Sequence, residues 1–260
     1  MNLLRKGCFI FALMILLTAC GSKNASTNEM KLVEEGKFTY AASGEYKPFS
    51  YMKKDGTMTG FDIEVAEAIA KELDLKPVQK KFKFGGIIEG VKAGRFDAAV
   101  ASHEITEERL KVVHFSTPYY YSGPQIFVRP DSKVETLNDL KGKEIAVSKG
   151  TTFAELAKQV TDRIILLDSD VVALEALSKG KHDAVITDFV TGKEAIGAGM
   201  KIVGKEMLGR SEQGIAVAMD NDKLLKEINK ALDKLRESGT LTKISQKYFG
   251  EDITVLPEKQ

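Results

Sequence analysis

The chain has little cysteine, little histidine and no tryptophan. Its 260 residues include two cysteines, Cys8 and Cys20, and Cys8 lies in an N-terminal segment that we expect to be removed. A mature chain with one thiol cannot form an internal disulfide. The three histidines, His103, His114 and His182, do not have the spacing of metal ligands. We therefore expect neither a disulfide framework nor a metal centre.

An excess of charge of one sign is also missing. Setting aside Arg5 and Lys6 of the N-terminal segment leaves 36 of the 38 lysines and arginines, against 37 aspartates and glutamates. This balance gives no support for nucleic-acid binding. After the N-terminal segment, no apolar run is long enough to cross a bilayer, so the body of the protein is expected to be soluble.

Nucleotide-binding motifs are absent as well. Residues 149–152 (KGTT) lack the glycine-rich lead and the Gly-Lys-Ser/Thr order of a phosphate loop. Residues 197–199 (GAG) lack the later glycine of a dinucleotide fingerprint. No nucleophile elbow of a serine hydrolase is present. The sequence therefore predicts no cofactor.

The N-terminus has the pattern of an export signal. Two basic residues precede an apolar run over residues 9–17, which is too short to span a bilayer. Residues 17–21 (LTACG) resemble a bacterial lipoprotein signal, which implies cleavage before Cys20 and a lipid on its sulfur. An ordinary secretory signal with an incidental Cys20 is the alternative. Residues 22–28 are small and polar, as in a flexible tether.

We therefore assign residues 1–19 to the signal peptide and residues 20–36 to the lipidated cysteine and tether. Removing the first 19 of 260 residues leaves 241, enough for one large or two medium domains.

Strand and helix patterns alternate along the mature chain. The clearest helix covers residues 61–73, where Phe61, Val65, Ile69 and Leu73 fall on one apolar stripe. The pattern breaks at residues 129–132, and a second alternating unit follows. Predicted strands cover 38–41, 77–82, 95–100, 112–115, 145–147, 164–167, 184–187 and 202–203; further helices cover 86–93, 153–160, 171–177, 224–236 and 241–248, with one more starting after Thr106. Residues 125–128 and 214–219 are apolar, and the second of these segments could carry the chain back to the first unit. This alternation predicts an α/β protein with parallel sheets covered on both faces.

Polar residues follow three of the predicted strands. In such sheets ligands bind beyond the carboxyl ends of the strands. Because the three clusters come from both alternating units, we expect the ligand to lie between the units. The clusters are Ser102, Glu104 and Arg109 after the strand ending at Val100, Thr151 and Thr152 after Val147, and Asp188 after Thr187.

Arg109 has an unusual position for a cation. Thr106 is a good N-cap, and Glu107 and Glu108 suit the first turn of a helix, whereas a cation there opposes the helix dipole. A guanidinium beside loop N–H donors would suit a carboxylate ligand. The alternative is that Arg109 only pairs with Glu104 or another nearby acid.

Nine short motifs recur in a characteristic order between residues 38 and 250. Together they resemble the family-3 extracellular solute-binding proteins of polar amino acid ABC transporters. The motifs are residues 44–49 (GEYKPF), 60–64 (GFDIE), 105–109 (ITEER), 115–119 (FSTPY), 139–143 (DLKGK), 149–152 (KGTT), 183–188 (DAVITD), 239–241 (GTL) and 248–250 (YFG).

The resemblance implies a two-lobe, periplasmic-binding-protein-like (type II) fold with the ligand cleft between the lobes. Two crossings would join the lobes, which close on an amino acid. We place lobe 1 at residues 37–122 and 217–260, and lobe 2 at residues 123–216.

The resemblance also implies roles for individual residues. Arg109 would hold the ligand α-carboxylate through its planar fork, with Thr151, Thr152 and Ser102 supplying further polar contacts. Asp188 would hold the α-ammonium group; its alternative role is a helix cap.

Tyr46 and Phe84 match aromatic positions that sandwich the ligand side chain in this family. Ordinary core packing is their alternative role. Phe82 could take the place of Phe84.

Three departures from the family pattern leave the substrate open. Glu104 stands where the family usually has a small or hydroxyl residue, so it could lower carboxylate affinity, bind an ammonium or select a cationic side chain; it could also point to solvent. Ser43 stands where several relatives that bind cationic amino acids carry Asp, which argues against such ligands. The charged segment 210–213 (RSEQ) could reach the distal end of the ligand.

We therefore expect a monomeric, lipid-anchored receptor on the extracytoplasmic side of the membrane. It would capture a polar amino acid, deliver it to an ABC transporter permease and have no enzymatic activity. Cystine or another sulfur-containing amino acid is an alternative ligand. A dehydratase on the same fold, with Glu104 as general acid, is an alternative activity. A sensory domain would need a transmembrane helix and an output domain.

Overall fold

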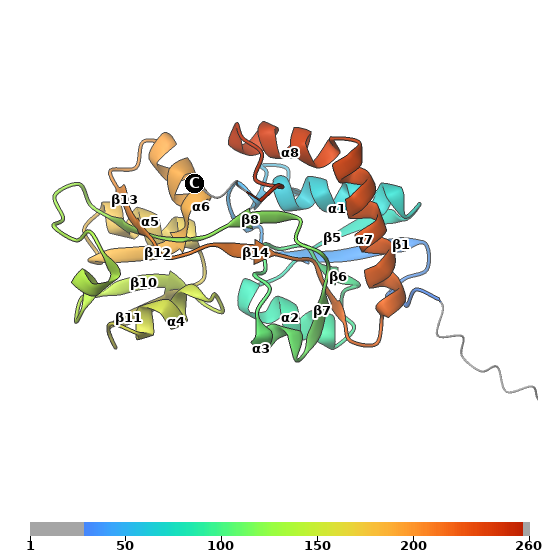
Figure 1. Ribbon diagram of the computed structural model, residues 1–260, viewed down its shortest axis with the longest axis horizontal. Coiled ribbons are helices and arrows are strands. Elements are labelled where there is room, and N and C mark those ends of the chain that lie inside the picture. Colours follow the sequence, from blue (N-terminus) through green and yellow to red (C-terminus); the bar gives the residue numbers. More distant parts are fainter. Residues whose placement is uncertain (1–28, 257–260) are drawn as a thin grey trace, which may run out of the picture.

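The computed structural model describes residues 29–256. The predicted signal peptide and Cys20 lie outside these residues. Two separate five-stranded sheets lie side by side, each with helices on its faces, and two extended segments run between them (Figure 1). The chain therefore has the two-lobe α/β fold that the motifs predict. Among residues 29–256, none of the helices is both long and apolar enough to span a bilayer.

The first lobe is built on the sheet with strand order β5-β1-β6-β15-β7. Helices α1, α7 and α8 pack together, and α2 packs near β15 and β6. Phe61, Val65 and Ile69 of α1 are fully buried, as the apolar stripe predicts. The elements are β1 (Lys37–Ala42), α1 (Phe61–Glu72), β5 (Lys76–Lys81), α2 (Phe84–Lys92), β6 (Ala98–Ala99), α3 (Glu107–Leu110), β7 (Val113–Phe115), β15 (Ala216–Ala218), α7 (Asp222–Glu237) and α8 (Thr240–Phe249).

A small three-stranded sheet lies beside the first lobe. It consists of β2 (Glu45–Tyr46), β3 (Ser50–Met52) and β4 (Met58–Thr59). None of the strands predicted from the sequence covers residues 44–59. The strand β2 is only two residues long, which is too short to show an alternating pattern.

The second lobe is built on the sheet with strand order β11-β10-β12-β9-β13. Helix α4 packs with one apolar cluster of this lobe, and α5 and α6 pack with another. The elements are β9 (Pro124–Val128), η1 (Leu137–Leu140), β10 (Ile145–Ser148), α4 (Phe153–Lys158), β11 (Ile164–Leu167), α5 (Asp170–Ser178), β12 (Ala184–Asp188), α6 (Phe189–Gly197) and β13 (Val203–Met207).

Two antiparallel strands connect the lobes, β8 (Tyr120–Ser122) and β14 (Ser211–Gln213). The first of these crossings is anchored in the core of the first lobe. The ring of Tyr120 lies 5.0 Å from that of Phe49 and 5.5 Å from that of Phe61.

The alternation of strands and helices had predicted parallel sheets. Both sheets are mixed instead. β1 runs parallel to β5 and β6, and β10 runs parallel to β11 and β12. β15 is antiparallel to β6 and β7, and β9 is antiparallel to β12 and β13. β9 and β15 continue the two crossings, so each enters its sheet from the other lobe instead of through a crossover helix.

The segment before β1 is packed against the first lobe. The backbone N–H of Lys31 donates to Asn221 at 3.2 Å, and that of Val33 donates to Asp97 at 2.6 Å. Met30 and Leu32 pack against the first-lobe core. The prediction of a flexible tether up to residue 36 is therefore wrong for these residues, because apolar burial and buried acceptors hold them in place.

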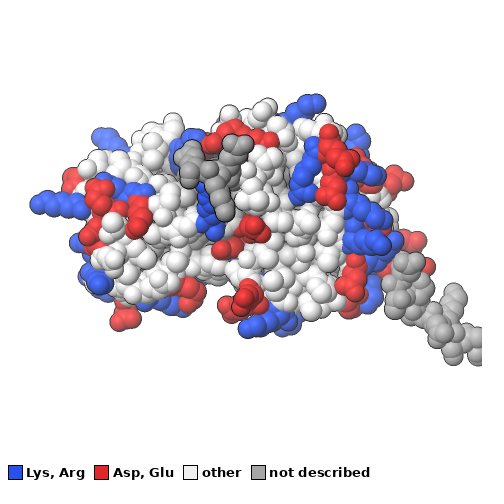
Figure 2. All heavy atoms as spheres, viewed as in Figure 1, with Lys and Arg blue, Asp and Glu red and all other residues white. Residues whose placement is uncertain are grey.

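Acidic and basic side chains are interspersed over the face shown in Figure 2. Acidic and basic side chains also pair between the two lobes. The ammonium of Lys83 lies 2.9 Å from the carboxylate of Asp168, and that of Lys47 lies 2.8 Å from that of Glu194. The lobes are therefore in contact and the cleft is shut.

Candidate functional site

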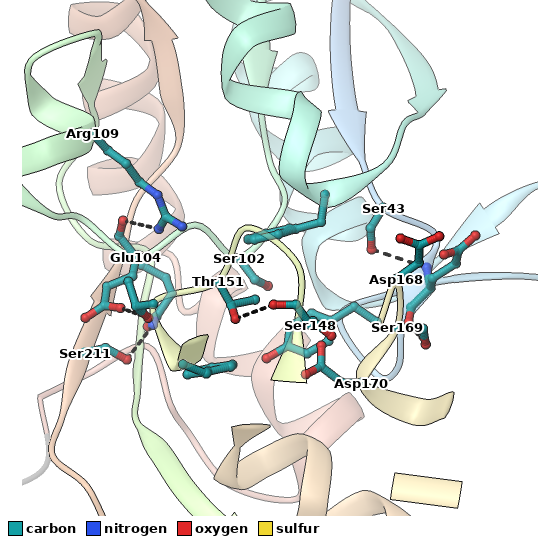
Figure 3. A pocket seen from close by; sticks show the side chains of 16 residues that line it. Ser43, Ser102, Glu104, Arg109, Ser148, Thr151, Asp168, Ser169, Asp170 and Ser211 are labelled. Carbon is teal, nitrogen blue, oxygen red and sulfur yellow. Dashed lines mark hydrogen bonds between the residues drawn. The ribbon is translucent and has the colours of Figure 1, made fainter. Parts of the chain in front are cut away.

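A cavity lies between the two lobes. Figure 3 shows the side chains that line it. Both lobes contribute, as the polar clusters at the strand ends predict. The lining residues are Ser43, Glu45, Tyr46, Phe84, Ser102, Glu104 and Arg109 from the first lobe, Ser148, Thr151, Thr152, Phe153, Asp168, Ser169 and Asp170 from the second, and Ser211 and Gln213 from β14.

The structure brings seven of the eight predicted ligand-binding residues together in this wall. These are Tyr46, Phe84, Ser102, Glu104, Arg109, Thr151 and Thr152. The eighth, Asp188, is not among the lining residues of the cavity.

Arg109 spans the cleft. Thr106 caps α3 by accepting a hydrogen bond from the backbone N–H of Arg109 at 3.2 Å, as the sequence predicts. One guanidinium nitrogen donates to the backbone carbonyl of Glu104 at 2.8 Å. The other donates to the carbonyl of Gly150, in the second lobe, at 3.0 Å. Burial lowers the pKa of Arg109, while Glu104 and Glu108 act in the opposite direction. A guanidinium has five N–H donors, so these two bonds leave capacity for a ligand.

The carboxylate of Glu104 also reaches across the cleft. It accepts a hydrogen bond from the hydroxyl of Thr152 at 2.5 Å. Thr152 is a predicted donor to the ligand carboxylate, and here it donates to a carboxylate of the chain itself. The Glu104 side chain therefore points into the cleft rather than to solvent, beside Arg109 (Figure 3).

Ser102 is held by a buried network. Its φ of 58° lies in the left-handed region, which is uncommon for serine and typical of functional sites. Its backbone N–H donates to the Tyr119 hydroxyl at 3.0 Å, and its hydroxyl donates to Asp62 at 2.8 Å. Tyr119 also donates to Asp62, at 2.6 Å.

Burial raises the pKa of Asp62 to about 6, although the two hydroxyl hydrogen bonds act to lower it. The sequence had indicated only that Asp62 is an acid at the start of a helix.

Tyr46 and Phe84, the two predicted aromatic residues, line the cavity together with Phe153, which was not predicted. Tyr46 stacks on Phe49 with ring centroids 4.9 Å apart, and Phe84 stacks on His103 at 4.4 Å. Phe82 is not a lining residue and packs on Phe96 at 5.5 Å, so Phe84 is the one that faces the cavity. Burial and the charge of Arg109 hold the pKa of His103 well below its usual value, so its ring is neutral.

Asp188 ends β12 and caps α6. Its carboxylate accepts a hydrogen bond from the backbone N–H of Val190 at 2.9 Å. Burial raises its pKa to about 7, and the nearby Asp170 adds to the rise. Asp188 also acts electrostatically on Tyr46, which lines the cavity. Asp188 therefore lies close to the cavity, and its predicted contact with an ammonium group stays a prediction.

The sequence analysis missed the acids that follow β11. Asp168, Ser169 and Asp170 come directly after the strand 164–167, so the rule used for the other strand ends also points to them. Asp168 is exposed and pairs with Lys83 at 2.9 Å and Lys149 at 3.3 Å. Asp170 is buried and accepts a hydrogen bond from the Thr187 hydroxyl at 2.7 Å.

The segment 210–213 divides between two cavities. Ser211 and Gln213 line the cavity between the lobes, and Arg210, Ser211 and Glu212 line a second one beside the C-terminal segment. Glu212 and Gln213, which are neighbours in β14, therefore face different cavities, as successive residues of a strand do.

The backbone of Gly150 in the second lobe lies against the backbone of Gly85 in the first lobe, near Arg109. A Cβ atom at Gly150 of the second lobe would lie 2.7 Å from the Cα atom of Gly85 in the first. Gly150 also has a φ of 78°, which favours glycine. The contact that positions the Gly150 carbonyl for Arg109 therefore depends on the absence of side chains.

Two lobes that shut over a charged, partly aromatic cavity define a binding protein for a small polar ligand. The chain belongs to the bacterial extracellular solute-binding proteins, family 3, whose model it matches over residues 38–251.

Named relatives in this family are similar over most of their length. The probable amino-acid-binding protein YxeM of Bacillus subtilis is 35% identical, and the match covers 95% of each chain. The L-cystine-binding protein TcyJ of Escherichia coli is 32% identical, and the match covers 86% of each chain. The structure of an ancestral arginine-binding protein bound to arginine is 34% identical with a TM-score of 0.79, covering 85% of this chain and all of that one.

Proposed function

We propose that the protein captures an amino acid outside the cytoplasmic membrane and delivers it to the permease of an ABC importer. The observation that carries this proposal is the cavity between the lobes with Arg109 in its wall, in a chain whose relatives are named as amino-acid-binding proteins. A guanidinium in a water-poor cavity is suited to the carboxylate that every amino acid has.

In the proposed complex, the ligand carboxylate lies against Arg109, Ser102 and the two threonines, Thr151 and Thr152. It would take over donors that now bind the Glu104 carboxylate and two backbone carbonyls. Asp188, which does not line the cavity itself, would attract the α-ammonium group through its negative charge.

The ligand side chain would lie between Tyr46 and Phe84. Both rings line the cavity and are backed by other rings, so their positions are fixed before the ligand arrives.

The direct experiment is a thermal-shift screen against the amino acids, followed by calorimetry on the hits. A ligand that binds the folded state stabilises it by mass action, by about 2.7 kcal/mol at a hundred times its Kd. At least one amino acid should raise the melting temperature. If no amino acid at millimolar concentration does so, the proposal is wrong.

We also propose that the mature chain is a monomer anchored through a lipid on Cys20. Replacing Cys20 with Ala should release the protein from membranes into the medium or periplasm. A variant that fractionates with membranes like the wild type would contradict the anchor, and light scattering of the soluble domain checks the monomer.

The proposal includes binding without turnover. Glu104 is the one candidate general acid from the sequence, and its carboxylate accepts a hydrogen bond from Thr152. Incubation with cyclic carboxylates should give no elimination product; a product that disappears in the Glu104→Gln variant would establish a dehydratase instead.

A further inference from the structure

Helix α6 begins beside the cavity and runs along the boundary between the lobes. It follows Asp188 directly, and the carboxylate of Asp188 accepts a hydrogen bond from the backbone N–H of Val190 at 2.9 Å. The backbone N–H of Phe189 donates to the carbonyl of Gly123, next to the first crossing, at 3.0 Å. The start of α6 is therefore attached both to the predicted ammonium-binding residue and to a crossing that joins the lobes.

The first turn of α6 is packed against the other lobe. Val190 is 4% exposed and belongs to the apolar core of the first lobe, although the chain places it in the second. Phe189 packs against the same core. The crevice beside Val190 is lined from the first lobe by Pro48, Tyr248 and Phe249. Burial of apolar side chains between two lobes favours the arrangement in which the lobes touch.

Two ion pairs flank this apolar contact. Lys193 of α6 lies 2.7 Å from Glu251, just after α8, and Glu194 lies 2.8 Å from Lys47. Both pairs join α6 to the first lobe, and Figure 1 shows α6 and α8 on the same side of the molecule. All four side chains are more than a third exposed, so each pair is weak by itself.

These contacts differ from the contacts between the lobes at Arg109. There, Arg109 and Thr152 bond to groups of the chain that a ligand carboxylate would replace. Val190, Lys193 and Glu194 are not among the residues that line the cavity. Their contacts with the first lobe can therefore persist when a ligand is bound.

We propose that α6 is a latch that holds the lobes shut. The α6 latch consists of Val190, buried in the first-lobe core, and of Lys193 and Glu194, paired with the first lobe. Because it does not touch the ligand, it stabilises the shut form equally for every ligand. Closure is part of binding, so the latch contributes a common factor to all affinities. This inference concerns the closing of the lobes and does not depend on which ligand they enclose.

The closing equilibrium can be measured without a ligand. Lys226 on α7 and Lys181 after α5 are exposed positions in different lobes, and each is replaced by Cys to carry a spin label. The mature chain carries Cys20→Ser, so only the two introduced cysteines are labelled. Pulsed electron spin resonance then gives the distances between the labels in shut and open molecules, and the ratio of the two forms.

The charged part of the latch is tested with Lys193→Glu, which places a negative charge beside Glu251. We expect the ratio of shut to open molecules to fall by roughly twofold to tenfold, because an attractive exposed pair becomes a repulsive one. The double variant Lys193→Glu with Glu251→Lys restores the pair and should return the ratio to within about twofold of the wild type. Lys179→Glu is the matched control, since Lys179 pairs with Glu175 of its own lobe.

The apolar part of the latch is tested with Val190→Ala. Alanine keeps the backbone N–H that bonds to Asp188 and removes two methyl groups from the first-lobe core. The ratio of shut to open molecules should fall by roughly tenfold. Circular dichroism checks the fold, and the Lys193 variants decide alone if Val190→Ala does not fold.

Three results would overturn the latch. One is a ratio that stays unchanged in Lys193→Glu, and another is a fall of the same size in the control Lys179→Glu. The third is a fall that the double variant does not reverse, because the change then does not come from the pair between Lys193 and Glu251. These measurements use the ligand-free protein, so failure of the latch is distinguishable from failure of amino-acid binding.

Discussion

The polar groups at the Arg109 end of the cavity are bonded differently from the buried carboxylate of Asp170. At the Arg109 end, the polar groups of the two lobes already bind one another, through the Glu104 carboxylate, the Gly150 carbonyl and the Thr152 hydroxyl. At Asp170, the buried carboxylate accepts its hydrogen bond from the hydroxyl of Thr187, in the same lobe. A ligand must therefore displace contacts between the lobes at the Arg109 end, whereas the contact at Asp170 lies within the second lobe. Lobe closure and ligand binding thus compete for the same polar groups at the Arg109 end.

The largest effect should come from Arg109→Ala. Losing one partner of a buried charge pair costs about 2–5 kcal/mol, so affinity for every amino acid ligand should fall by roughly 30-fold to several thousand-fold. Calorimetry gives the affinity, and circular dichroism checks the fold. Arg163→Ala is a matched control because Arg163 is exposed and bonds only near its own strand. If Arg109→Ala binds amino acids as tightly as the wild type, Arg109 does not bind the ligand carboxylate.

A second, pH-dependent effect should come from Asp188. Its pKa in the ligand-free protein is about 7 instead of the usual 3.8, and an ammonium group favours its ionised form. Affinity should therefore fall as pH drops below about 7, by up to about tenfold per pH unit. Asp188→Asn should bind weakly at all pH values and lose this dependence.

The same raised pKa has the opposite consequence for the ligand-free protein. The folded state binds more protons than the unfolded state between about pH 4 and 7, so Asp188 makes stability fall as pH rises through that range. Denaturant titrations of wild type and Asp188→Asn measure the difference. Affinity and the free energy of unfolding are each compared between wild type and Asp188→Asn at pH 5.5 and at pH 8. If neither difference changes with pH, the role assigned to Asp188 is wrong.

The smallest effect should be a gain in affinity from Glu104→Gln. Removing the negative charge weakens the internal contact with Thr152 and frees donors for the ligand, so affinity should rise by about three- to tenfold, as expected for about 1 kcal/mol. Glu107→Gln, on the exposed side of α3, is the control. A loss of affinity instead would mean that Glu104 contacts the ligand ammonium. The ligand would then not have to displace the Glu104 carboxylate from Thr152.

Much of the site could be predicted from strand ends. The rule that ligands bind beyond the carboxyl ends of strands predicts Arg109, Thr151 and Thr152 at one site, and all three line the same cavity. The same rule would have found Asp170, because the strand over 164–167 was recognised. The direction of a side chain was harder, because it depends on packing between elements that are distant in the sequence.

The misses in the fold have the same cause. The antiparallel direction of β9 and β15 follows from the crossings between lobes, which local patterns do not encode. Asp62 is an acid at a helix start by sequence, and only its contacts with Ser102 and Tyr119 make it a support of the cavity wall. Local periodicity predicts elements well, whereas contacts between elements decide what each polar residue does.

The meeting of Gly85 and Gly150 has a practical consequence. A single methyl group added at Gly150 would act as a wedge that keeps the lobes slightly apart, and it would strain a residue whose φ is 78°. The same wedge would move the Gly150 carbonyl away from Arg109, the group proposed to bind the carboxylate of every ligand. Closure and carboxylate binding are therefore coupled at this position, so a substitution here changes the affinity for all amino acids together.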